Sequence, residues 1–136
     1  MPALNRLYDE YGSRIAFLVV YILEAHPSDV WQMESNIRDH VVFASPKDEG
    51  ERAQVAGACV RKLGIKFPAV LDEFGNAAEK AYTAWPDRMY LIDSSGRIAY
   101  KSKPGPFGFK TDELRAAIVR VLDNRHTTAA LTTSSP

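Results

Sequence analysis

The longest apolar run of the chain extends from Ile15 to Leu23, nine residues that read IAFLVVYIL. A short run rich in β-branched and aromatic residues favours a strand that is buried on both faces, as central parallel strands are. The polar sequence EAHPSD follows at once. In open α/β sheets, ligands and catalytic groups gather beyond the carboxyl ends of such strands. The pattern therefore predicts a scaffold strand that leads directly into a candidate site.

Two residues of that polar sequence, Glu24 and His26, carry groups that can transfer protons. They are two positions apart, and side chains at that spacing lie on the same side of an extended chain. We predict that they form a proton-transfer pair. The alternative is a solvated strand exit with a turn at Pro27 and Ser28, because polar strand ends are common.

Hydrophobic periodicity and turn residues predict the other elements. Helices are expected at Pro2–Tyr11, from Ser45 to Gly64, at Ala77–Trp85 and at Asp112–Leu122; strands are expected at Phe67–Leu71, in a hairpin of Arg88–Asp93 and Arg97–Lys101, and as an edge strand at Val41–Ala44. Ser45 is the predicted N-cap of the second helix and Pro46 its first residue. Gly12 is predicted to end the first helix in the left-handed conformation, and Gly64 to end the second.

This order of elements predicts one α/β domain over residues 1–125, followed by a disordered tail over residues 126–136. The order resembles the thioredoxin fold, a three-layer α/β/α arrangement, in an N-terminally incomplete form with the first central strand missing. The strand at Ile15 would then have one unpaired edge. An unpaired edge can pair with another chain, so a homodimer is possible.

Composition narrows the classes of function. Lys plus Arg and Asp plus Glu are 17 each, so there is no electrostatic argument for nucleic acid or for an anionic membrane. No run reaches the ~18 apolar residues of a membrane span, and the N-terminal sequence MPALNRLYDEYG has no apolar core of a signal peptide. The single cysteine, Cys59, excludes an intrachain disulfide and a multi-cysteine metal site. We expect no metal, no cofactor and a cytoplasmic location.

Three stretches carry a resemblance to the iodothyronine deiodinase family. They are FLVVYILEAHPSDVW, which ends at Trp31, PDRMYLID at Pro86–Asp93 and GRIAYKSKPGPFGF at Gly96–Phe109. The resemblance extends over Pro2 to Leu122. It implies a thioredoxin-like fold and thiol or selenol reduction of a small-molecule or thiol substrate. It also places the nucleophile at the start of the first helix, at a position before Met1, so the chain is expected to be N-terminally truncated or inactive.

The resemblance also implies roles for individual residues. Glu24 and His26 match the acidic residue and the histidine beside the nucleophile, and His26 is expected to hydrogen-bond the substrate or relay protons. Arg88 matches an arginine that binds an anionic group. Animal deiodinases use a second histidine where this chain has Pro46, so a general thiol-reductase or peroxidase-like role is a safer expectation than thyroid-hormone deiodination.

Each of these roles has a structural alternative. Arg88 could pair with Asp87 or Asp93. Trp31, which we place among the substrate-binding residues, could be a core or lid aromatic. Cys59 lies on the apolar stripe of its predicted helix and fits a small buried hydrophobe better than a reactive thiol.

The sequence leaves open whether the chain is an enzyme. The first hypothesis is a deiodinase-like oxidoreductase, and the alternative is a catalytically inactive thioredoxin-like binding module. A non-functional truncated product is the third reading.

Overall fold

The chain forms two compact units, an N-terminal unit of residues 1–86 and a C-terminal unit of residues 87–136. The computed structural model describes residues 1–25, 27–29, 34–38, 40 and 42–132, with side chains except at 35, 36 and 125–132. The elements are α1 (Pro2–Tyr11), β1 (Val19–Tyr21), α2 (Glu34–Arg38), α3 (Glu49–Lys62), β2 (Ala69–Leu71), α4 (Ala77–Tyr82), β3 (Tyr90–Ile92), β4 (Ile98–Lys101) and α5 (Thr111–Thr132). The predicted α/β class is confirmed.

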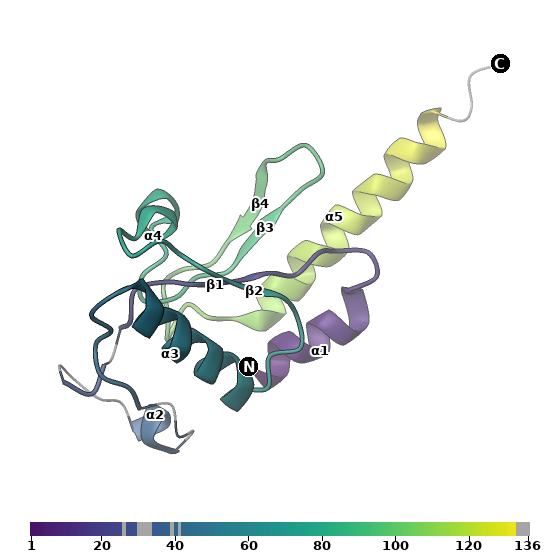
Figure 1. Ribbon diagram of the computed structural model, residues 1–136. Coiled ribbons are helices and arrows are strands. Elements are labelled where there is room, and N and C mark those ends of the chain that lie inside the picture. Colours follow the sequence, from purple (N-terminus) through teal and green to yellow (C-terminus); the bar gives the residue numbers. More distant parts are fainter. Residues whose placement is uncertain (26, 30–33, 39, 41, 133–136) are drawn as a thin grey trace. The chain divides into compact units, whose positions relative to one another are not determined.

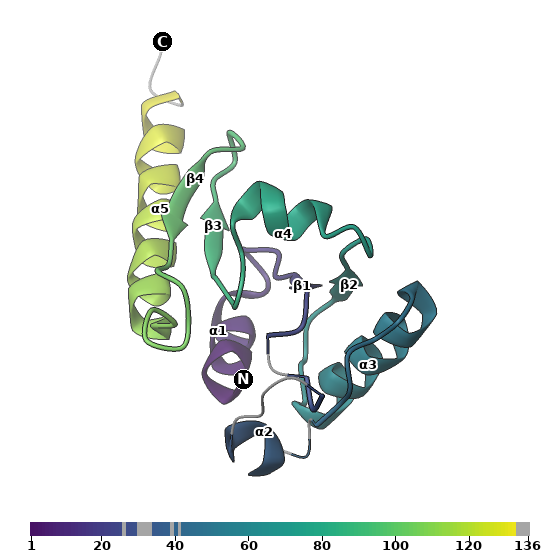
Figure 2. The same ribbon diagram turned by 90° about the vertical axis from the view of Figure 1, so that its left-hand side faces the viewer.

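The N-terminal unit is built around one parallel strand pair. In the register of β1 with β2, Val20 lies opposite Val70 and Tyr21 opposite Leu71. Parallel strands need a long crossover connection, and α3 is part of it. On one side of the pair lie α1 and α3, and on the other side lies α4 (Figure 1 and Figure 2). Both strands therefore end at the same edge, and the segments that follow them come together there.

The first helix has the predicted bounds and buries Leu7 and Tyr11. The left-handed conformation predicted for Gly12 is wrong, because its φ is −61° and its amide donates to the carbonyl of Tyr8 as in a regular helical turn. A Cβ on Gly12 would lie 2.6 Å from that carbonyl oxygen and 3.0 Å from the ring of Tyr8. The glycine is needed for this close approach, because the Tyr8 ring packs against Phe17 and Phe67.

The start of α3 differs from the prediction. The N-cap is Asp48, whose carboxylate accepts a hydrogen bond from the amide of Glu51, and the helix begins at Glu49. Ser45 is not the cap because its amide and hydroxyl both donate to Asp29, at 2.8 and 2.9 Å. The predicted end is confirmed: Leu63 is the C-cap, and Gly64 has a φ of +59°.

The prediction that the strand at Ile15 is buried on both faces is wrong. Only Val19–Tyr21 form β1, and on one face of the pair Leu18, Val20 and Val70 are 57%, 41% and 46% exposed. On the opposite face Val19 and Tyr21 are half-buried, and the hydroxyl of Tyr21 lies against Cys59 of α3. The edge strand predicted at Val41–Ala44 is also wrong for its described residues, since 42–44 belong to no strand.

The C-terminal unit is the predicted β-hairpin packed on the last helix. The strands β3 and β4 pair antiparallel, and Asp93 forms the turn by accepting hydrogen bonds from the amides of Ser95 and Arg97. In both views α5 lies along the hairpin (Figure 1 and Figure 2). Its buried residues are Leu114, Ala117, Ile118 and Leu122, which follow the helical spacing i, i+3, i+4 and i+8.

The last helix extends to Thr132, ten residues beyond its predicted end. The extent of the predicted domain, residues 1–125, and the disorder predicted for residues 126–136 stay predictions. Among the described helices, none combines the length and the apolar character that are needed to cross a membrane.

Candidate functional site

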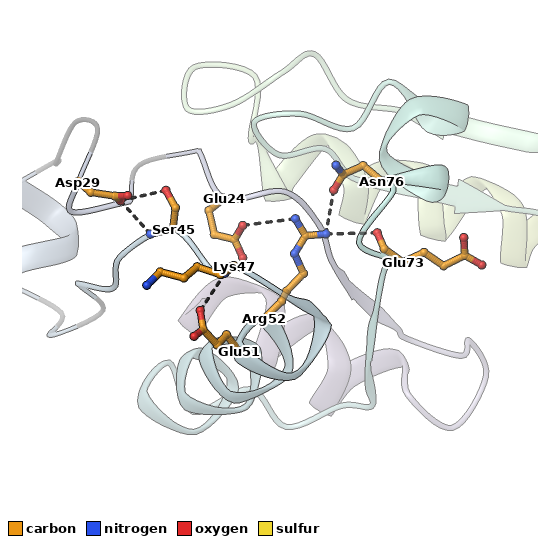
Figure 3. A network of polar contacts seen from close by, with 8 residues as sticks. All are labelled: Glu24, Asp29, Ser45, Lys47, Glu51, Arg52, Glu73 and Asn76. Carbon is orange, nitrogen blue, oxygen red and sulfur yellow. Dashed lines mark hydrogen bonds and ion pairs between the residues drawn. The ribbon is translucent and has the colours of Figure 1, made fainter.

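The candidate carboxylate, Glu24, lies just beyond the carboxyl end of β1. Its side chain is only 10% exposed, and its Oε2 lies 3.7 Å from Nη2 of Arg52, whose side chain is 2% exposed (Figure 3). A carboxylate so far from water needs a positive partner, because the interior cannot solvate an isolated charge. The predicted position of Glu24 at the end of the strand is confirmed, and its immediate partner is an arginine that the sequence did not single out.

The guanidinium of Arg52 also binds the segment that follows β2. Its Nη1 donates to the backbone oxygen of Glu73 at 3.2 Å and to Oδ1 of Asn76 at 2.9 Å. The guanidinium carbon lies 4.6 Å from the centre of the Phe74 ring, which is a cation–π distance. The arginine reaches these partners from the first turn of α3. It therefore connects the segments at the ends of both parallel strands.

Arg52 could have been found in the sequence from its helical position. Arg52, Val55, Ala56 and Cys59 follow the spacing i, i+3, i+4 and i+7, which puts them on one face of a helix. A charged residue at the start of an apolar stripe is a signal that it is buried and paired.

Two further titratable groups, Tyr21 and Cys59, lie against Glu24. Burial raises the pKa of the Tyr21 hydroxyl, and the Cys59 thiol and the Glu24 carboxylate raise it further through their charges and hydrogen bonds. Burial also raises the pKa of the Cys59 thiol, which a hydrogen bond with Tyr21 and the charge of Lys62 partly offset. Because a thiol with a raised pKa is protonated at neutral pH, Cys59 is a weak nucleophile.

The polar sequence after β1 is held by residues 43–45. The amide of Ser28 donates to the carbonyl of Phe43 at 2.7 Å, and Pro27 is buried. The two hydrogen bonds from Ser45, first from its amide and then from its hydroxyl, lower the pKa of the Asp29 carboxyl. The amide of Lys47 donates to the Glu51 carboxylate at 2.8 Å, at the start of α3 (Figure 3). Residues 28 and 29 are thus held by hydrogen bonds to residues 43 and 45.

Two of the predicted site residues, His26 and Trp31, lie outside the described residues. The contact between Glu24 and His26 therefore stays a prediction, as does the substrate-binding role of Trp31. Among the described side chains, no group of three or more His, Cys, Asp and Glu could hold a metal ion.

The fourth predicted residue, Arg88, belongs to the C-terminal unit and is half-buried just before β3. Its Nη1 donates to the backbone oxygen of Ser102 at 3.2 Å, and its Nε has no partner among the described residues. Neither of the ion pairs considered as alternatives, with Asp87 or with Asp93, forms between these side chains. Burial raises the pKa of the Asp87 carboxyl, which a hydrogen bond from the amide of Gly105 partly offsets.

Comparison with known proteins defines the class to which this chain belongs. The model of the iodothyronine deiodinase family matches residues 1–122. The chain is a member of the iodothyronine deiodinase family, as the three sequence stretches predicted.

Individual relatives agree with this membership. The chain is 35% identical to thyroxine 5-deiodinase of Rattus norvegicus over 129 residues, which is 94% of this chain and 40% of that protein. It is 35% identical to thyroxine 5-deiodinase of Homo sapiens over 127 residues, 93% of this chain and 40% of that protein. It is 34% identical to type I iodothyronine deiodinase of Xenopus laevis over 111 residues, 81% of this chain and 41% of that protein. The chain thus spans about 40% of the length of these relatives.

Proposed function

We propose that the chain is the thioredoxin-like domain of a deiodinase-like oxidoreductase, which reduces a small organic substrate with thiols as the electron donors. Family membership supports the reaction class. The observation that carries the proposal is the buried carboxylate of Glu24, paired with Arg52 beyond the end of a parallel strand. Ligands bind at that place in open α/β sheets.

In the proposed reaction, Glu24 handles protons and external groups supply the electrons. Two thiols, or a selenol and a thiol, are oxidised to a disulfide or a selenenyl sulfide, and the substrate gains their two electrons. In a dehalogenation, the carbon–halogen bond breaks, halide leaves and the carbon takes up a proton. Glu24, with His26, passes that proton. The binding of an anionic group by Arg88, a residue of the C-terminal unit, stays a prediction of the family resemblance. The family resemblance puts the nucleophile at the start of the helix that corresponds to α1, and the proposal gives Cys59 no part in the chemistry.

The thioredoxin-like arrangement itself is part of the proposal. It is supported by the parallel pair β1–β2, by the antiparallel hairpin β3–β4 and by the helices that follow. Among the described residues the hydrogen-bonded strand partner of β1 is β2 alone, and the thioredoxin arrangement has a strand on both sides of β1. We propose a further strand at that edge, which a second copy in a homodimer could also provide. The cytoplasm, where thiols are reduced, is the location that suits this chemistry.

Thiol-dependent turnover tests the proposal. The chain is incubated with dithiothreitol and 3,5-diiodotyrosine, and release of iodide is measured for wild type, for Glu24→Gln and for the control Glu49→Gln. Glu49 lies on the same unit, exposed at the start of α3. We expect Glu24→Gln to lose at least about 100-fold in rate, in the range of a lost general acid or base. Iodide release by Glu24→Gln at the wild-type rate would refute the role of Glu24, and the absence of iodide release by wild type would refute turnover by this chain.

A second candidate is a binding module without turnover, and the chemistry of Cys59 favours it. It is the only cysteine in the sequence, and burial raises the pKa of its thiol. In this case the chain would bind the substrate analogue without releasing iodide, and Cys59→Ser would bind it equally well. Iodide release that is lost in Cys59→Ser would contradict both this candidate and our exclusion of Cys59 from the chemistry.

A further inference from the structure

We propose that Arg52 is the positioning residue of the site: it fixes the carboxylate of Glu24 relative to the ends of β1 and β2, and proton transfer depends on it. This inference rests on the proposed function, because it concerns the group that moves the proton. Arg52 itself is held on α3 and does not need to touch the substrate.

Glu24 needs such an anchor because its own backbone is weakly held. It lies three residues beyond the end of β1, in an irregular segment. Among the described residues, the last backbone hydrogen bond of the strand is from the amide of Asp72 to the carbonyl of Tyr21, and none involves residues 22–25. The orientation of the carboxylate therefore comes from its side-chain contacts, which are the hydrogen bond with Tyr21 and the ion pair with Arg52. Of these two partners, Arg52 is the one that carries a positive charge.

Arg52 can serve as the anchor because its guanidinium makes three further contacts. The carbonyl of Glu73 and the amide oxygen of Asn76 accept from Nη1, and the ring of Phe74 lies against its face. A planar guanidinium can satisfy such a set of directions at once, whereas an ammonium group acts as a point charge with no plane to stack. The arginine thus holds Glu24 in a fixed position relative to the segment after β2.

The geometry of the pair leaves one oxygen of the carboxylate without a hydrogen-bond donor among the described residues. The distance of 3.7 Å between Arg52 Nη2 and Glu24 Oε2 is longer than the ~2.7–2.9 Å of a direct charged hydrogen bond. Oε1 of Glu24 and Nε of Arg52 are buried and have no hydrogen-bond partner among the described residues. The carboxylate is thus held in place while Oε1 keeps its capacity to accept a proton or a hydrogen bond. A buried acceptor without a hydrogen bond lowers the free energy of unfolding.

The test compares Arg52→Lys and Arg52→Met with the control Arg61→Met. Arg61 lies exposed in the last turn of the same helix. Iodide release from 3,5-diiodotyrosine with dithiothreitol gives kcat and KM. We expect kcat to fall at least tenfold in Arg52→Met with KM changed less than threefold, an intermediate value in Arg52→Lys, and wild-type values in Arg61→Met. A kcat in Arg52→Met equal to that of the control would overturn the inference.

A double variant separates positioning from stability. Arg52→Met leaves the carboxylate of Glu24 buried without its cation, and Glu24→Gln in that background removes the charge. We expect the double variant to regain most of the lost thermal stability and to have the kcat of Glu24→Gln alone, because both changes act through one carboxylate. A kcat in the double variant that is lower than that of Glu24→Gln by the factor lost in Arg52→Met would show that Arg52 acts independently of Glu24 and would overturn the inference.

A measurement without turnover distinguishes failure of this inference from failure of the proposed function. The NMR signal of the Glu24 side-chain carboxyl carbon is recorded in wild type, Arg52→Lys and Arg61→Met. We expect the signal to shift or broaden in Arg52→Lys only. An unchanged signal would refute positioning by Arg52 even if iodide is released. A changed signal in a chain that releases no iodide would support the positioning and refute the proposed function.

Discussion

The fold predicts that Asp72 is a main source of stability at the end of β2. Asp72 is only 4% exposed. Its two carboxylate oxygens accept hydrogen bonds from the backbone amides of Ala78 and Glu79, each at 2.9 Å. These amides are in the first turn of α4 and have no partner within the helix. Replacing one helix cap costs about 0.5–2 kcal/mol, so the loss of both bonds in Asp72→Ala should cost about 1–4 kcal/mol. Asp72→Asn keeps one acceptor and should cost about half as much.

The contribution of Asp72 should depend on pH in a defined direction. Burial acts to raise the pKa of this carboxyl, but the amides of Glu79, Ala78 and Glu73 and the charge of Arg52 lower it overall. A carboxyl whose pKa is lower in the folded state stabilises the fold above its unfolded pKa of about 3.9. This stabilisation is lost as the pH falls through the lower, folded-state pKa. The difference between wild type and Asp72→Asn should therefore be constant from pH 7 to about pH 5 and shrink below about pH 4.

Urea unfolding followed by circular dichroism between pH 3 and pH 7 measures this difference. The matched control is Glu73→Gln, an exposed neighbour whose side chain should contribute within about 0.5 kcal/mol. An Asp72→Asn variant as stable as wild type at pH 7 would refute the capping argument. A difference that does not shrink below pH 4 would refute the role of the charge.

Three further predictions concern single side chains. Ser102→Ala should destabilise the C-terminal unit by about 1–3 kcal/mol in urea unfolding, because its buried hydroxyl accepts from the amide of Met89 at 2.9 Å; a variant as stable as wild type would contradict this. Gly108→Ala should lower the melting temperature, since its Cβ would lie 2.4 Å from the backbone of Lys103, while Gly75→Ala has open space and should not; equal melting temperatures would refute the close approach. Cys59 should react with iodoacetamide at pH 8 more slowly than a free cysteine, because burial raises its pKa; reaction at the rate of the free amino acid would refute the protonated, half-buried thiol.

The elements with local signals could be predicted from the sequence. The bounds of α1, the hairpin around Ser94-Ser95-Gly96 and the buried face of α5 all follow from periodicity and turn residues that lie within the element itself. The position of Glu24 beyond a strand was predicted in the same way, because the change from apolar to polar residues is abrupt there.

The features that depend on distant partners could not be predicted in this way. The N-cap of α3 is Asp48 and not the predicted Ser45, because the side chain of Ser45 is hydrogen-bonded to Asp29, sixteen residues earlier. The apolar run at Ile15 predicted a strand buried on both faces, but burial depends on which helices cover the pair. Leu18 and Val20 are exposed. The pairing of Glu24 with Arg52 joins residues 28 positions apart, and its sequence signal is only a charged residue at the end of an apolar stripe.

The location of the substrate is the most direct test of the account. Amide NMR spectra of the chain are recorded while 3,5-diiodotyrosine is added without any thiol. The account predicts that the amides that move most are those of residues 22–25, after β1, and of residues 73–76, after β2, and that these shifts are reduced in Glu24→Gln. Shifts that avoid both segments, for instance only along α5, would contradict a substrate site at the end of the parallel strands.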